Sequence, residues 1–117
     1  MKAIFKEWHS ASALDIALAA LELHRAAGQI AAARAKLCDA GQVLPRVVKQ
    51  WKAEEQDLRD FATGFYDAFL TAALRQFGFH LAKSVPPLDT TAHALLAVAW
   101  VRRAIESATP PRASDQT

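Results

Sequence analysis

One stretch of the chain, residues 57–83, constrains the fold more than any other. It holds six of the ten aromatic residues. On a helix of 3.6 residues per turn, its polar residues fall on one narrow stripe and apolar residues cover the remaining faces. The stripe consists of Asp57, Asp60, Gly64, Asp67, Thr71, Arg75 and Gly78. Because burying one Phe side chain stabilises a fold by roughly 2–3 kcal/mol, we expect this helix to be covered on most sides and to supply most of the core.

Helix-forming residue types dominate the rest of the chain as well. The 117 residues include only four Gly and five Pro, and no alternating strand pattern is present. The length suits one domain with its own core. The sequence therefore predicts an all-α bundle of three long helices plus a short N-terminal helix. We expect a single domain over residues 1–108 and a flexible tail over residues 109–117.

Local signals place the first long helix. Ser12 followed by Asp15 has the spacing of a capping box in its Asp form. The apolar periodicity that starts there predicts a helix from about residue 12 to about residue 40. Gly28 is the position at which this helix would divide into a hairpin.

The second long helix begins after a turn. Gly41 suits the left-handed conformation that often follows a helix, and Pro45 suits the first turn of the next one. No stop signal follows before Gly64, so an unbroken helix over residues 45–83 would be about 58 Å long, against about 30 Å for a small compact domain. We expect either a break near residues 53–64 or an elongated bundle that a partner chain completes.

A proline-containing connector precedes the last helix. Pro86 and Pro87 cannot continue a helix, so residues 84–88 form the connector. Asp89 or Thr90 is placed to cap the helix that follows. We expect that helix to be largely buried through its apolar set, Leu95, Leu96, Val98, Trp100, Val101 and Ile105.

The chain has one cysteine and no long apolar run. Cys38 has no second thiol for a disulfide or a zinc site, so we expect a small buried side chain. Residues 1–9 lack the apolar run of a secretory signal. The longest uncharged run near the C-terminus, residues 90–101, is shorter than the roughly 18 residues that suggest a membrane span. These observations predict a soluble cytoplasmic protein with no membrane partner.

Part of the first helical region resembles a known repeat. Small, apolar and proline positions occur at the spacings of the second half of a tetratricopeptide motif. These positions are Gly28, Ala33, Leu37, Ala40 and Pro45. Residues 17–45 therefore resemble one tetratricopeptide-like helical hairpin, which would imply a protein-interaction surface. Three or more such repeats normally stack to bury a continuous core.

A second resemblance concerns Arg75 and His80, which are separated by four residues late in the expected penultimate helix. This arrangement, in a small all-α domain and just before a turn, is similar to the motif of HEPN-type ribonucleases. The resemblance implies that Arg75 contacts phosphate and stabilises transition-state charge. It assigns His80 to the RNA cleavage chemistry. The alternative is that Arg75 pairs within its own helix and His80 caps the helix end.

A basic zone precedes an acidic one in the middle of the chain. Arg46, Lys49 and Lys52 lie close to Trp51 in the expected second long helix. Helix-borne cations beside an exposed aromatic side chain can hold a nucleic-acid backbone and stack a base. The alternative is a solvated face, with Trp51 packed inward and the lysines paired with neighbouring carboxylates.

The sequence contains no pattern typical of a cofactor or metal site. The four His residues are not paired at helical ligand spacing, and no glycine-rich phosphate loop is present. Since 52% of the residues are hydrophobic, the helices are hard to cover within one short chain, which favours self-association.

We therefore interpret the chain as a non-enzymatic helical interaction or assembly module that forms a homo-oligomer. An unknown protein partner is also expected, and no cofactor or metal. Two alternatives stay open: a HEPN-like metal-independent ribonuclease, and a small helical subunit that binds a nucleic-acid backbone.

Overall fold

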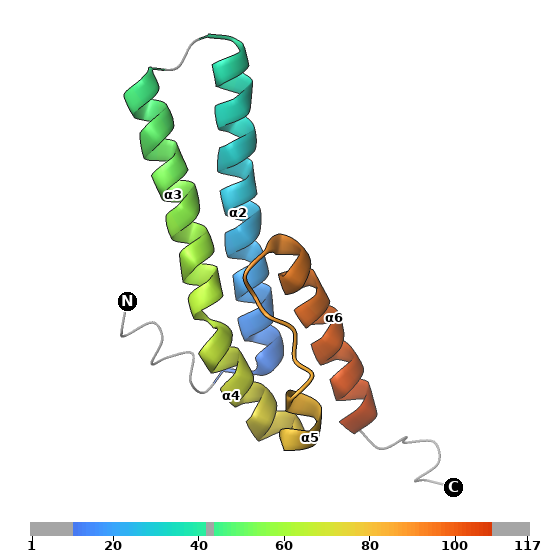
Figure 1. Ribbon diagram of the computed structural model, residues 1–117. Coiled ribbons are helices and arrows are strands. Elements are labelled where there is room, and N and C mark those ends of the chain that lie inside the picture. The colour runs from blue at the N-terminus through green and yellow to red at the C-terminus, as the bar shows by residue number, and fades with distance from the viewer. Residues whose placement is uncertain (1–10, 42–43, 109–117) are drawn as a thin grey trace, which may run out of the picture.

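The computed structural model describes residues 11–41 and 44–108, and all regular structure in these ranges is helical (Figure 1). The helices are α2 (Ala13–Asp39), α3 (Pro45–Gly64), α4 (Tyr66–Phe77), α5 (Phe79–Ala82) and α6 (Thr91–Ala108). The prediction of an all-α bundle with three long helices is confirmed. The expected short N-terminal helix and the expected tail over residues 109–117 lie outside the described residues.

Helix α2 begins and ends where the sequence predicts. The Ser12 hydroxyl accepts a hydrogen bond from the backbone N–H of Asp15 at 3.1 Å and so caps the first turn. Gly41, with a φ of 68°, adopts the left-handed conformation just past the helix end. The expected division at Gly28 is wrong, because α2 continues through it. One Gly costs a helix interior only about 1 kcal/mol, which is too little to divide a helix of 27 residues.

This continuity also shows where the helical hairpin of the protein lies. Residues 17–39 all belong to α2, so this stretch contains no internal turn. The helical hairpin of the protein is instead formed by α2 and α3, which lie side by side (Figure 1). Helix α3 starts with Pro45 in its first turn, as predicted.

The long helix considered for residues 45–83 is divided in two places. Phe65, with φ −74° and ψ −7°, separates α3 from α4, and its N–H donates to the Ala62 carbonyl at 3.2 Å. Gly78, with a φ of 88°, separates α4 from α5 in a conformation that favours Gly. The first division lies next to the expected range of 53–64. The molecule is also elongated, with extents of 67 × 30 × 20 Å.

The core lies where α2, α4 and α6 meet. Its largest fully buried apolar side chains are Phe69, Ile16, Leu88 and Val101. Many of the remaining core positions are Ala, whose small side chains let the helices approach closely. Alanine therefore forms much of the core itself and is more than a covering around the aromatic helix.

The stretch over residues 57–83 is covered less completely than expected. Phe65 is buried, but Leu74 is 41% and Phe79 is 73% exposed. Helices α2, α3 and α6 pack against α4. Among the described residues, these three helices leave Leu74 on α4 and Phe79 on α5 largely uncovered, and this explains the difference from the prediction.

Helix α6 is buried on one side only. The Thr90 hydroxyl accepts from the His93 N–H at 3.0 Å, so Thr90 caps the helix. The inner side is made of Ala94, Ala97, Val98, Val101 and Ala104. The expectation of a largely buried helix is wrong, because Leu95, Leu96 and Ile105 are exposed. Small residues face the core and permit close packing, and the larger Leu side chains point outward.

Two regions of the molecule differ in their depth of packing. We call residues 28–39 of α2 and 45–61 of α3 the arm, and residues 13–27 of α2 with α4 and α6 the base. The arm extends beyond α6 (Figure 1), and no residue of it is buried. Cys38 lies near the end of α2 and is exposed, which corrects the expectation of a buried thiol.

Candidate functional site

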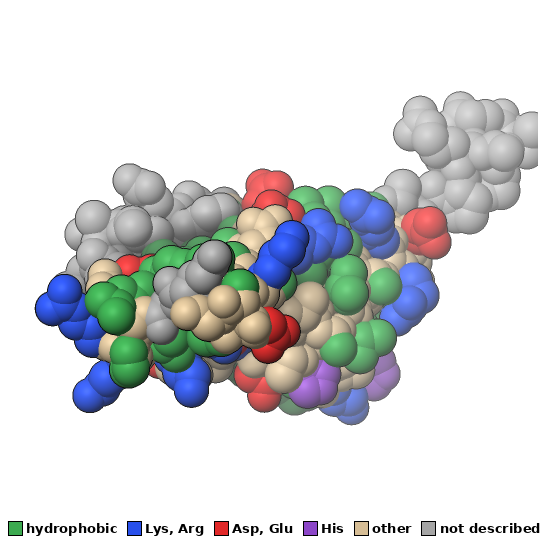
Figure 2. Space-filling model, turned by 90° about the horizontal axis from the view of Figure 1, so that it is seen from above, with side chains coloured by type: hydrophobic (Ala, Val, Ile, Leu, Met, Phe, Trp, Pro, Cys, Tyr) green, Lys and Arg blue, Asp and Glu red, His purple; other side chains and the backbone are tan. Residues whose placement is uncertain are grey.

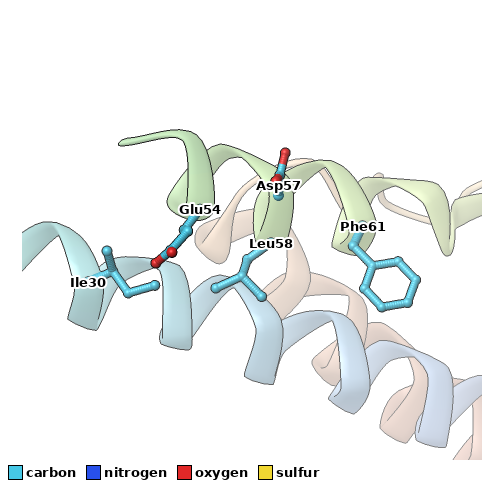
Figure 3. Close-up of a pocket in the computed structure, with 5 residues that line it drawn as sticks. All are labelled: Ile30, Glu54, Asp57, Leu58 and Phe61. Atoms are coloured by element: carbon cyan, nitrogen blue, oxygen red, sulfur yellow. The ribbon is translucent and has the colours of Figure 1, made fainter. Parts of the chain in front are cut away.

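An open groove runs along the arm between α2 and α3 (Figure 3). One hollow of about 400 Å³ is lined by Ile30, Glu54, Asp57, Leu58 and Phe61. A second hollow of about 130 Å³ is lined by Ile30, Ala33, Trp51 and Glu54. The two hollows share Ile30 and Glu54, so we treat them as one feature and call it the arm groove.

Helical periodicity explains which side chains line the arm groove. On α3, Trp51, Glu54, Leu58 and Phe61 are spaced by three, four and three residues, which places them on one side of the helix. The floor is apolar and the charges stand at the rim. Figure 3 shows Glu54 reaching toward α2, whereas Asp57 points away from α2. The groove therefore combines an apolar floor with an acidic edge.

Ion pairs hold the two helices of the arm together. Arg34 on α2 contacts Glu55 on α3 at 2.7 Å, and Arg59 contacts the second carboxylate oxygen of Glu55 at 3.5 Å. The hydrogen bond from Arg34 is the main cause that lowers the pKa of Glu55, and Arg59 lowers it further. All three side chains are largely covered, so this network links α2 to α3 in the absence of a buried apolar core.

The same network continues into the base through His24, which is fully buried. The Nε2 atom of His24 lies 2.8 Å from the Leu88 carbonyl oxygen, and its Nδ1 atom lies 3.2 Å from Nη1 of Arg59. A carbonyl only accepts and a guanidinium only donates. His24 therefore donates from Nε2 and accepts at Nδ1. This arrangement joins α2, α3 and the connector before α6.

The sequence analysis missed the role of His24. The only signal was its helical position on the apolar side of α2, because its partners come from residues far away in the chain. A fully buried ring with both nitrogens bonded to protein atoms has no free atom for a substrate. We assign His24 to positioning of the helices.

Neither Arg75 nor His80 lines the arm groove. Arg75 lies on α4 and donates from Nη2 to the Ala11 carbonyl at 3.0 Å. Its neighbour Gln76 accepts from the Ala13 N–H at 2.5 Å. His80 is exposed on α5, beyond the division at Gly78. Arg75 and Gln76 together tie the start of α2 to α4, and the ribonuclease assignment stays a prediction.

The basic zone is exposed, but its aromatic neighbour faces another direction. Arg46, Lys49 and Lys52 are exposed, whereas Trp51 is half-buried in the arm groove. Two residues along a helix correspond to a rotation of about 200°, so Lys49 and Trp51 lie on nearly opposite sides. Within the described ranges, the ion pairs do not include these three cations. The zone can contact an anion, but Trp51 is not beside Lys49 to stack a base.

Exposed apolar side chains also occur outside the arm. A hollow of about 270 Å³ beside α4 and α5 is lined by Tyr66, Leu70, Leu74, Phe79, Ala82 and Lys83. On α6, Leu95 is 48% and Leu96 is 55% exposed. Seen from above, hydrophobic side chains reach the surface at several places between the charged ones (Figure 2). Folding of a single chain thus leaves three apolar surfaces uncovered by described residues.

Two classes of site are not found in the described part of the chain. Over residues 11–41 and 44–108, no three His, Cys, Asp or Glu side chains cluster as metal ligands would. In the same ranges, no helix combines the length and apolarity that crossing a membrane requires.

Comparisons with known proteins assign no family. No family model matches the chain, and the searches of curated proteins and of solved structures gave no significant match. The resemblances to a tetratricopeptide hairpin and to HEPN ribonucleases therefore stay predictions.

Proposed function

We propose that this chain is a helical interaction module that assembles with copies of itself and carries out no reaction of its own. The arm groove carries this proposal. It presents apolar side chains from two helices in a region without buried residues. Burying apolar surface is favourable by about 25 cal/mol per Å². A second protein that covers the groove would supply the burial that the arm does not obtain from its own chain.

The elongated shape supports the same function. A stable interface between two proteins typically buries about 1,200–2,000 Å² in total. The arm, built from 12 residues of one helix and 17 residues of another, is about 26 Å long at 1.5 Å per residue, in a molecule 67 Å long. It therefore offers a long surface, and contiguous exposed apolar surface of this kind is typical of protein interaction sites.

The proposal is tested by the mass of the protein in solution across a dilution series. Light scattering is expected to give a mass above that of a monomer at micromolar concentration, with dissociation on dilution. Leu58→Ser in the groove should shift dissociation to higher concentration. Leu44→Ser, at a 60% exposed position next to the start of α3, is the matched control and should leave the mass unchanged. A monomer at every concentration would contradict the proposal.

One observation favours a second candidate function, binding of a nucleic-acid backbone. Arg46, Lys49 and Lys52 are exposed and lie outside the ion pairs of the described residues. Phosphate contacts release counterions, so binding to generic RNA or DNA should fall steeply with salt. Lys49→Glu combined with Lys52→Glu should abolish it. Absence of binding at low salt would eliminate this candidate.

A further inference from the structure

The outer side of α6 carries apolar and basic residues together, with the exposed Glu106 at its C-terminal end. Leu95, Leu96, Ala99, Arg102 and Arg103 are spaced by three, four and seven residues, which places them on one side of the helix. We call this side the α6 face. Its leucines are about half exposed, and both arginines are exposed. Within the described ranges, neither arginine takes part in an ion pair.

The α6 face is complementary to the arm groove in chemistry. The groove has an apolar floor, to which Ile30 and Leu58 belong, and carries carboxylates at its edge. The described ion pairs include neither Glu54 nor Asp57. The α6 face offers leucines for the floor and arginines for the edge. Carboxylates and arginines that meet across an interface set the register and disfavour wrong partners.

The spacing of apolar and charged residues also agrees. Leu95 and Arg102 are seven residues apart, and so are Phe61 and Glu54. Seven residues along a helix correspond to about 10.5 Å. A helix laid along the groove would place its arginines near Glu54 while its leucines contact the apolar floor.

The other exposed basic surface does not share these properties. Arg46, Lys49 and Lys52 lie on α3, and the exposed Leu next to them in the chain, Leu44, precedes that helix instead of sharing their side of it. Within the described residues, the α6 face joins exposed leucines to unpaired arginines on one helix side. This difference selects α6 as the element that fits the arm groove.

We propose that the α6 face of one copy docks in the arm groove of a second copy, with Arg102 and Arg103 placed against Glu54 and Asp57. This inference rests on the proposed self-association and specifies its interface. The groove lies on the arm and α6 lies on the base, so the contact joins two different surfaces. Contacts of this heterologous kind build rings or extended chains unless two copies exchange them reciprocally.

Charge reversal on each side of the contact tests the inference. The groove variant carries Glu54→Arg and Asp57→Arg, and the α6 variant carries Arg102→Glu and Arg103→Glu. Each variant alone brings like charges together, so its dissociation constant for self-association should rise at least about tenfold. Mixing the two variants brings opposite charges together again and should restore assembly. The parent chain and the variant Lys49→Glu with Lys52→Glu are the controls and should assemble equally.

The outcomes separate this inference from the proposed function. A parent chain that stays monomeric contradicts both. A parent chain that assembles while both variants assemble equally well overturns the inference and leaves the proposed function intact. Two monomeric variants that fail to assemble on mixing also overturn it. Restoration in the mixture supports it and shows at the same time that both variants are folded, which circular dichroism checks independently.

Discussion

The base and the arm are built from the same helices but use their apolar residues in different ways. In the base, α2, α4 and α6 enclose Phe69 and Ile16 completely. In the arm, two helices lie side by side, and no residue is buried. Ion pairs through Glu55 and half-buried side chains hold the arm together. The difference shows that the base supplies the buried core of the fold, whereas the arm leaves its apolar side chains partly exposed.

The largest predicted effect concerns the core of the base. Phe69→Ala should lower the free energy of unfolding by about 3–5 kcal/mol, because it empties a fully enclosed site. Phe79→Ala is the matched control, since Phe79 is 73% exposed. It should change the free energy of unfolding by less than about 0.5 kcal/mol. Chemical denaturation of dilute protein measures both. A loss below about 1 kcal/mol for Phe69→Ala would place the core elsewhere.

A smaller effect is expected where the base meets the arm. His24→Leu removes the donor to the Leu88 carbonyl and the acceptor for Arg59. Leaving a buried polar group unpaired costs about 1–3 kcal/mol, so the variant should be destabilised by that amount. His80→Leu, at an exposed position, should leave the thermal midpoint nearly unchanged. Equal midpoints for the two variants would show that the His24 network contributes nothing.

The smallest effect concerns the ion pairs of the arm. The pKa of Glu55 is lowered in the folded state, mainly by its hydrogen bond from Arg34. A lowered pKa means that the stabilisation is present above the unfolded-state value of 4.5 and is lost as the pH falls through the folded-state value. Glu55→Gln should therefore destabilise the protein at neutral pH by about 1 kcal/mol or less. The difference from the parent chain should shrink below pH 4.5. Denaturation curves at several pH values measure it, and a difference that grows on acidification would contradict the assignment.

Local signals made the helices of the fold predictable from the sequence. Ser12, Gly41, Pro45 and Thr90 act within one helical turn of their own position, and each is found in the predicted role. The division at Phe65 was less predictable, because that residue keeps helical backbone angles. Its position depends on how α4 packs against α2 and α6.

The candidate site was only partly predictable. That Trp51 and Lys49 lie on nearly opposite sides of α3 follows from helical geometry, so the sequence alone contained this information. The contacts of His24 required the positions of α2, α3 and the connector together. The exposure of Leu95 depends on which side of α6 faces α2. Helical periodicity gives α6 one side with leucines and one side with alanines. Close helix packing places the alanine side against the core.

Hydrogen exchange at several protein concentrations tests most directly the claim that the base holds the fold and the arm is covered by a second copy. In dilute protein, amides of residues 30–37 and 50–60 should exchange faster than those of residues 66–76, because the arm opens locally without unfolding the base. As the concentration rises through the range in which the protein assembles, exchange in the arm should slow while exchange of residues 66–76 stays the same. Arm amides that are as protected as base amides at every concentration would contradict the account.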